Sequence, residues 1–230
     1  MRTGKRVAVE SFPERKARVL RILHGLHDRY PQADCALQHC SGFQLICATI
    51  LSAQCTDERV NKVTPALFER YPDAAALAKA PQAEVEALIR STGFFRNKAK
   101  NLIGMAAGLV ARHGGQVPDT MEELLQLPGV ARKTANVVLG TWFQKNEGIV
   151  VDTHVGRLVD RLGLLQNARD AKDAAKIELD LQPLVPRDEW TYFSHALIWH
   201  GRKVCFARKP NCPGCNLAPD CPSAALVDRT

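Results

Sequence analysis

Apolar residues recur at helical intervals along most of the chain. Ser11 and Glu14 have capping-box spacing, and the apolar residues of 19–26 follow at helical intervals. Residues 44–53 (QLICATILSA) are apolar nearly all round, as in a helix buried inside an α-domain. We expect further helices before Gly93, from Thr120, from residue 131 or 132, and over 97–113, 152–162, 168–184 and 190–204. No alternating strand pattern appears, so the sequence predicts an all-α fold.

Composition and charge narrow the class of protein. The 230 residues are 46% hydrophobic and 24% charged, and no apolar run is long enough to span a membrane. The first residues lack the apolar stretch of a secretion signal, so we expect a cytoplasmic protein whose eight cysteines are thiols or metal ligands. The net charge of +7 includes three basic stretches without acidic residues, at 88–117, 124–146 and 190–219, which favour a phosphate-binding surface.

A proline–glycine turn joins two short apolar segments in the middle of the chain. Pro128 and Gly129 end the first helix, and a second helix begins directly after the turn. Unpaired N–H groups at such a turn can bind a phosphate, although a plain αα-hairpin has the same pattern. Lys133 falls in the first turn of the second helix, where the helix dipole and partial burial would favour a neutral, nucleophilic amine. The alternative is an exposed lysine that only neutralises phosphate.

Asp152 follows the apolar run IVV and precedes a helical pattern. This position suits an N-cap residue, whose carboxylate accepts hydrogen bonds from the following N–H groups. A carboxylate held in this way could also assist proton transfer, or stabilise a sugar cation, if it faced Lys133.

Four cysteines are clustered near the C-terminus with the spacing C-x6-C-x2-C-x5-C: Cys205, Cys212, Cys215 and Cys221. Four thiolates form a complete ligand set with no open position, which excludes a hydrolytic metal centre. The spacing alone leaves zinc and an iron–sulfur cluster as equal alternatives.

Five segments together carry a specific resemblance to a known family. They are LSAQCTDERVNK (51–62), STGFFRNKAKN (91–101), LPGVARKTANVV (127–138), VDTHV (151–155) and the four-cysteine loop. In this order they resemble the endonuclease III family, the bifunctional DNA glycosylases/AP lyases of the helix-hairpin-helix superfamily. The resemblance implies that the cysteine loop holds a [4Fe–4S] cluster.

The resemblance also implies an architecture. We expect two helical domains, a six-helix barrel over 35–146 that carries the hairpin and an iron–sulfur cluster domain formed by 1–34 and 147–230. Damaged double-stranded DNA would bind in the groove between the domains. The protein is expected to act as a monomer without a membrane partner.

The matched motifs assign expected roles to single residues. Lys133 stands at the family's Schiff-base lysine and Asp152 at its catalytic aspartate. Gln54 matches the glutamine that fills the gap left by an extruded nucleotide, and Phe94 takes the place of an apolar wedge that is often leucine. Further DNA contacts are implied for Pro128, Gly129, Val130 and Ala131 of the hairpin, where Ala131 replaces a usual glycine, and for Arg208 and Lys209 of the cluster loop.

These assignments predict removal of oxidised pyrimidines from duplex DNA, followed by strand cleavage through β-elimination. An adenine-specific mismatch glycosylase shares the cluster and hairpin. However, it typically lacks this lysine and carries an early glutamate, whereas no glutamate precedes Glu58 in the corresponding region here. A purine-oxidation glycosylase would not be expected to carry the cluster loop. The alternative from a different class is a non-catalytic helix-hairpin-helix DNA-binding protein with a structural metal.

Overall fold

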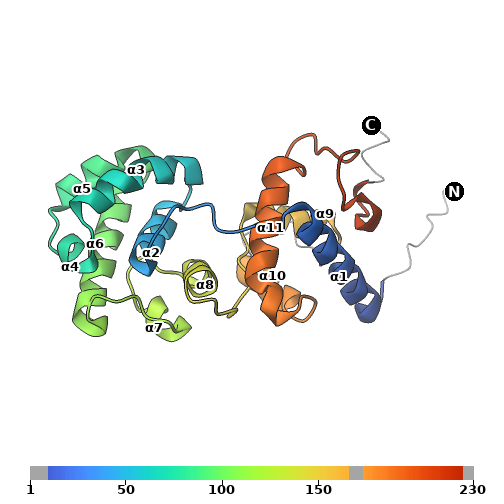
Figure 1. Ribbon diagram of the computed structural model, residues 1–230, viewed down its shortest axis with the longest axis horizontal. Helices are drawn as coiled ribbons and strands as arrows, with labels where there is room; N and C mark the ends of the chain where they lie inside the picture. Colours follow the sequence, from blue (N-terminus) through green and yellow to red (C-terminus); the bar gives the residue numbers. More distant parts are fainter. Residues whose placement is uncertain (1–9, 166–172, 225–230) are drawn as a thin grey trace. The chain divides into compact units, whose positions relative to one another are not determined.

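The computed structural model describes residues 10–165 and 173–224, and its regular elements in these ranges are all helices, as predicted (Figure 1). The α-helices are α1 (Phe12–Arg29), α2 (Gly42–Leu51), α3 (Asp57–Arg70), α4 (Ala74–Ala78), α5 (Gln82–Ile89), α6 (Phe95–His113), α7 (Met121–Leu125), α8 (Arg132–Thr141), α9 (Thr153–Arg161), α10 (Ala174–Leu181) and α11 (Trp190–Lys203). Short 3-10 helices are η1 (Arg90–Thr92), η3 (Arg187–Glu189) and η4 (Ala218–Asp220). In the described ranges, no helix is both long and apolar enough to cross a membrane.

Two sequence-based expectations fall partly outside these ranges. The helix expected over 168–184 is described only from residue 173, where α10 occupies Ala174–Leu181. The first nine residues, on which the absence of a secretion signal was judged, also lie outside the described residues.

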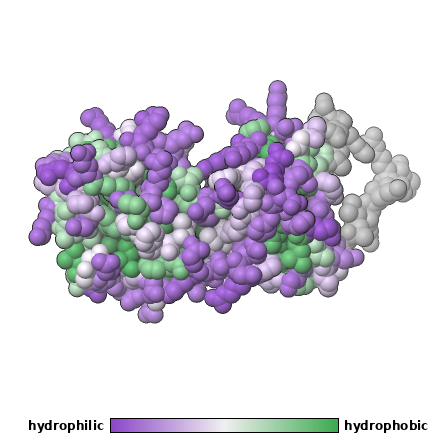
Figure 2. All heavy atoms as spheres, in the orientation of Figure 1, coloured by the Kyte–Doolittle hydropathy of each residue, from purple (hydrophilic) through white to green (hydrophobic). Residues whose placement is uncertain are grey.

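The chain divides into two compact units. One is formed by residues 34–147 and the other by residues 1–33 together with 148–230. Figure 2 shows hydrophilic residues over most of the visible face, with smaller apolar areas between them.

Helix α2 forms the centre of the 34–147 unit. Nine of its ten residues are buried, and it packs against α3, α6 and α8 (Figure 1). Gly42 allows the close approach of Trp142, because a Cβ at this position would lie 2.9 Å from the indole ring. The sequence of α2 is apolar on nearly every side because every side of the helix contacts protein.

Helix α1 is part of the core of the other unit. The predicted capping box is present, since Ser11 Oγ accepts from the Glu14 N–H and a Glu14 carboxylate oxygen accepts from the Ser11 N–H. The apolar face of α1 belongs to the same hydrophobic cluster as side chains of α9 and α11, including the fully buried Phe193. This unit is therefore assembled from the two ends of the sequence.

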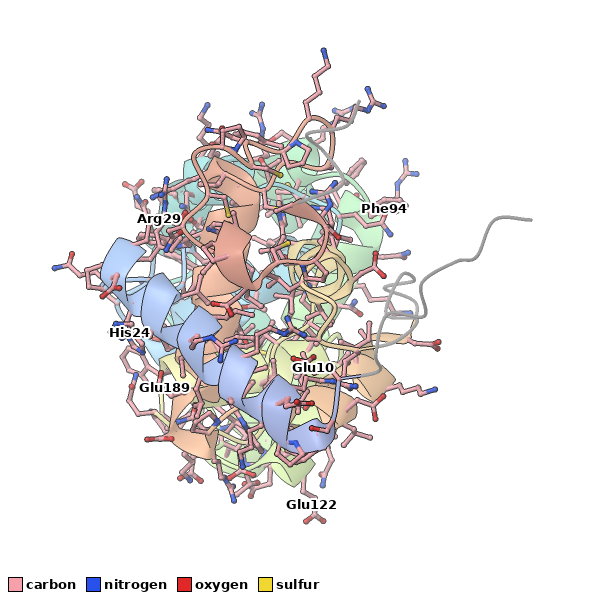
Figure 3. All side chains as sticks on the ribbon, turned by 90° about the vertical axis from the view of Figure 1, so that its right-hand side faces the viewer. Glu10, His24, Arg29, Phe94, Glu122 and Glu189 are labelled. Carbon is pink, nitrogen blue, oxygen red and sulfur yellow. The ribbon has the colours of Figure 1, made fainter. Side chains whose placement is uncertain are left out.

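Arg18 of α1 connects this helix to distant parts of the unit. Its guanidinium donates to the carbonyl oxygens of Leu162 at 2.6 Å, Gly163 at 3.1 Å and Asp220 at 3.1 Å. It also forms two hydrogen bonds with the carboxylate of Glu10, which is labelled in Figure 3. The hydrogen bond and charge of Arg18 hold the pKa of Glu10 below its ordinary value of 4.5.

Candidate functional site

The predicted hairpin is present between α7 and α8. The Val130 N–H donates to the carbonyl of Leu127 at 3.1 Å, and both side chains are buried. Pro128 and Gly129, between them, are exposed. The two apolar residues thus anchor the turn and leave its tip accessible to a ligand.

The hairpin packs closely on α6. A Cβ on Gly104 of α6 would lie 3.3 Å from the ring of Pro128. Gly129 has φ +77°, and a Cβ there would lie 2.7 Å from the Cβ of Asn101. Glycine is therefore required at position 129 by both conformation and space.

Ala131, which replaces a usual family glycine, sits in ordinary backbone. It is the exposed N-cap of α8, with φ −94° and ψ 169°, a conformation that any residue adopts. No side chain caps the start of α8 at this position. A helix start without a side-chain cap is a place where an anion can bind.

Lys133 is the second residue of α8 and is exposed. The expectation that it is partly buried is wrong, because the buried residues of α8 begin only at Ala135. The first turn of the helix is at the edge of the unit, so the Lys133 amine is open to solvent and to a substrate.

Asp152 is the N-cap of α9, as predicted. Its Oδ1 accepts hydrogen bonds of 2.8 Å from the N–H groups of both His154 and Val155. These bonds fix the carboxylate, and they leave Oδ2 as the oxygen that can face a substrate. Asp152 belongs to the unit formed by 1–33 and 148–230, whereas Lys133 belongs to the 34–147 unit.

Gln54 and Phe94 lie in two connections of the 34–147 unit, and both have left-handed backbone. Gln54 follows α2 with φ +52° and is exposed. Phe94 precedes α6 with φ +48° and is 64% exposed (Figure 3). A non-glycine residue with positive φ, and an aromatic ring left in water, both cost free energy. Such costs concentrate at functional positions.

The four clustered cysteines line one cavity of about 160 Å³ in the unit formed by 1–33 and 148–230. Cys205 follows α11, Cys212 and Cys215 lie in the loop, and Cys221 follows η4. Among the described residues, no three His, Cys, Asp or Glu side chains are grouped closely enough to hold a single metal ion.

Two side-chain nitrogens lie within hydrogen-bond distance of the cysteine sulfurs. Arg161 Nη1 donates to Cys205 Sγ at 3.2 Å, and His200 Nε2 lies 3.3 Å from Cys215 Sγ. Burial lowers the pKa of His200 to about 4, while burial raises the pKa of Cys215. The N–H donor of Arg161 can stabilise the negative charge of a thiolate ligand at Cys205. The donor set therefore fits a cluster bound through four thiolates.

Two arginines of α9 hold the loop that carries the predicted phosphate contacts. Arg161 donates to the carbonyls of Phe206 at 2.6 Å and Ala207 at 2.8 Å. Arg157 donates to the carbonyls of Gly201 at 3.0 Å and Cys205 at 3.1 Å. The next two residues along the loop, Arg208 and Lys209, are exposed as predicted.

Sequence reasoning missed the roles of Arg157 and Arg161. Both bind carbonyl oxygens far away in the sequence, and no local spacing reports such partners. It also missed Lys98 of α6, which is only 4% exposed. A signal for Lys98 was present, because it occupies the same helical face as Leu102 and Met105, a face that is otherwise apolar.

Comparisons with known proteins give a consistent result. The profile of the HhH-GPD superfamily base excision DNA repair proteins matches residues 47–187. Endonuclease III of Synechocystis sp. (strain PCC 6803) is 58% identical over 216 residues, covering 94% of this chain and 97% of that protein. A solved non-covalent endonuclease III–DNA complex superposes with a TM-score of 0.87 at 40% identity, covering 94% of this chain and 99% of that chain.

A second solved structure captures a reaction intermediate. It is a trapped endonuclease III–DNA covalent intermediate, with a TM-score of 0.85 at 40% identity, covering 92% of this chain and 97% of that chain. The family profile matches more than half of the sequence, and the sequence relative is matched over nearly its whole length. The chain therefore belongs to the endonuclease III family of the HhH-GPD superfamily.

Proposed function

We propose that this chain is a base-excision-repair DNA glycosylase and AP lyase that removes oxidised pyrimidines from damaged duplex DNA. The observation that carries the proposal is the exposed amine of Lys133, directly after a hairpin turn with no side-chain cap. A trapped covalent DNA intermediate of a 40% identical endonuclease III supports covalent chemistry. We further propose that the protein acts as a monomer in the cytoplasm, on the nucleoid.

Lys133 is the nucleophile. In its neutral form its Nζ attacks the C1′ atom of the damaged nucleotide, and the C1′–base bond breaks as the base leaves with the bonding electrons. Opening of the sugar ring then gives a Schiff base between Nζ and C1′. Loss of a C2′ proton and cleavage of the C3′–O bond complete β-elimination and cut the strand.

Asp152 assists at the same carbon. Its Oδ1 is occupied by two backbone N–H groups, so the carboxylate is fixed and its Oδ2 can act on the sugar. This oxygen accepts a proton from the attacking amine, or stabilises the positive charge that develops on the sugar.

The remaining predicted residues bind and open the duplex. The exposed turn of Pro128 and Gly129, together with the start of α8, binds a backbone phosphate, and the ordinary backbone of Ala131 is compatible with this role. Phe94 acts as the wedge and Gln54 fills the space of the extruded nucleotide. Their exposure in positive-φ connections supports this assignment.

The cysteines Cys205, Cys212, Cys215 and Cys221 hold a [4Fe–4S] cluster. The shared cavity, the Arg161 donor at Cys205 and the imidazole beside Cys215 support this assignment. When bound, the cluster gives the loop a fixed shape through four iron–sulfur bonds. Arg161 then keeps the chain before Arg208 and Lys209 in place, so that both side chains can face DNA phosphates.

Borohydride trapping tests the proposal. The enzyme is incubated with a duplex that contains one oxidised pyrimidine, in the presence of borohydride, which reduces a Schiff base to a stable amine. We expect the unmodified protein to become cross-linked to DNA and Lys133→Ala to lose the cross-link. Lys79→Ala removes another exposed lysine of the same unit and is expected to behave as the unmodified protein.

The outcomes separate the candidate functions. Persistent trapping in Lys133→Ala would remove this residue from its role. Binding without any base release or nicking would favour the non-catalytic alternative. Release of adenine from a mismatch without trapping would favour the mismatch glycosylase.

A further inference from the structure

Lys98 is a buried cation that the proposed chemistry does not use. It lies in the first turn of α6 and is 4% exposed, whereas the neighbouring Arg96 and Lys100 are exposed. Burial lowers the pKa of the Lys98 amine. A lysine is seldom buried in this way unless its ammonium group is bound by specific partners.

Both hydrogen-bond partners of Lys98 are main-chain carbonyl groups. Its Nζ donates to Leu51 O at 2.8 Å and to Thr92 O at 2.8 Å. Leu51 is the last residue of α2, and Thr92 is the last residue of η1. One ammonium group therefore joins two chain segments that are 41 residues apart in sequence.

Each of these carbonyls lies immediately before a connection with strained backbone. Gln54 is three residues after Leu51 and has φ +52°. Phe94 is two residues after Thr92 and has φ +48°. Lys98 thus joins the two connections that carry the residues assigned above to the opened duplex.

The other hydrogen bonds described at these two connections are local. Within the first connection, the Cys55 N–H donates to Ser52 O, which shapes the loop locally. Within the second, Thr92 Oγ1 donates to Ile89 O. Both bonds stay inside one segment, whereas the two bonds of Lys98 join the segments to each other. The packing of α2 against α6 brings the two connections into one unit, and Lys98 adds hydrogen bonds that join them directly.

We propose that Lys98 is a positioning residue, which fixes the connection of Gln54 relative to that of Phe94 so that both side chains enter the duplex together. The inference rests on the proposed roles of Gln54 and Phe94. Insertion at one lesion needs both side chains at a fixed separation, and a displacement of about 1 Å can cost up to about 100-fold in rate. Lys98 does not touch the DNA and acts only through these two residues.

Lys98→Met is the direct test, because it keeps most of the buried stem and removes the donors. On duplex DNA with 2-aminopurine beside one oxidised pyrimidine, we expect a weaker fluorescence rise on unstacking. We also expect base release under single-turnover conditions to slow about 10- to 100-fold. Lys98→Arg restores two N–H donors and is expected to recover part of both signals.

Met105→Ala is the matched control for lost stability. Met105 is fully buried two turns further along α6, and its truncation removes core packing without touching either connection. We expect this variant to melt at a lower temperature, with unchanged fluorescence and base release where it is folded. If Lys98→Met differs from the unmodified protein only in melting temperature, as the control does, the positioning role is refuted.

A combined variant shows whether Lys98 acts through the two side chains. If it does, adding Lys98→Met to Gln54→Ala/Phe94→Ala slows base release little further, whereas independent effects would multiply. If the reductions in base-release rate multiply, Lys98 does not act through these side chains. The positioning role of Lys98 would then be refuted, while the roles of Gln54 and Phe94 would stand. A fully active Gln54→Ala/Phe94→Ala variant would overturn those roles and the inference together, while trapping through Lys133 would be unaffected.

Discussion

Phe94 and Gln54 each combine an exposed side chain with a backbone conformation that costs free energy. Strain of this kind persists only where the surrounding structure holds it, and Lys98 supplies part of that support through Leu51 and Thr92. At the scale of single residues, the DNA-free chain therefore already holds the conformations that the proposed insertion needs.

Single charges also contribute to stability, as Glu10 illustrates. Its pKa is lowered in the folded protein, so its pairing with Arg18 stabilises the fold fully above its ordinary pKa of 4.5. This contribution is lost as the pH falls through the lowered pKa. We expect Glu10→Gln to lower the free energy of unfolding by up to about 1 kcal/mol at neutral pH, as for an ion pair near the protein surface.

Urea unfolding of both proteins across the acidic range measures this effect. The difference between Glu10→Gln and the unmodified protein should shrink progressively below pH 4.5. Glu69→Gln changes another exposed glutamate and should show no such dependence. A difference that stayed constant down to strongly acid pH would contradict the role of the ion pair.

Residue-level prediction from sequence succeeded where the role was local. The capping function of Asp152 could be predicted because its partners are the next residues along the chain. The prediction that Lys133 is partly buried was wrong, and the role of Lys98 was not predicted. The burial of each lysine depends on which other segments of the chain pack over it. The sequence around the lysine does not contain this information.

At the scale of elements, the predicted helices are confirmed in the described ranges, with ends that differ by a few residues. Helix α6 begins at Phe95 rather than near Asn97, because Phe94 turns the chain with positive φ. The helix expected before Gly93 is α5, and the 3-10 helix η1 separates its end at Ile89 from Gly93, which has φ +70°. Apolar periodicity predicts where a helix lies better than where it ends.

The hairpin gives a prediction for one element. Gly129→Ala forces an alanine into φ +77° and places its Cβ 2.7 Å from Asn101. We expect a loss of about 1–3 kcal/mol in stability and weaker binding to abasic-site DNA, because the turn must shift. Thermal unfolding and a binding titration measure the two effects.

Ala131→Gly is the matched control in the same turn. Ala131 has φ −94°, so glycine relieves no strain at this position. Its binding to DNA should stay close to that of the unmodified protein. Equal losses from Gly129→Ala and Ala131→Gly would contradict the argument from backbone conformation.

At the scale of the whole molecule, two exposed basic residues add positive charge to the cysteine loop. The chain carries a net charge of +7, and Arg208 and Lys209 follow the loop segment that Arg161 anchors. The spacing of the cysteines was readable from the sequence. The nitrogen atoms beside their sulfurs could not be predicted, because Arg161 and His200 come from other parts of the chain.

Removing the two basic residues tests the loop's contact with DNA. We expect Arg208→Ala/Lys209→Ala to retain the visible absorbance of an iron–sulfur cluster, because the four cysteines are intact. The slope of log affinity against log salt should fall by about two, since each phosphate contact releases about one counterion. Lys176→Ala, an exposed change on α10, should leave the slope unchanged.

Two results would contradict these expectations. An unchanged salt slope in the double variant would mean that the loop does not face phosphates. A colourless native preparation that contains zinc would exclude the iron–sulfur assignment while leaving the four ligands in place.

Building one unit from both ends of the sequence has a consequence for synthesis on the ribosome. Helix α1 is translated first, but its apolar face packs with α9 and α11, which emerge more than 120 residues later. The 34–147 unit is fully translated before α9 and α11 emerge. It can therefore fold before α1 packs with these helices. The cysteine loop emerges after α11, so the proposed cluster would be loaded late in the maturation of the nascent chain.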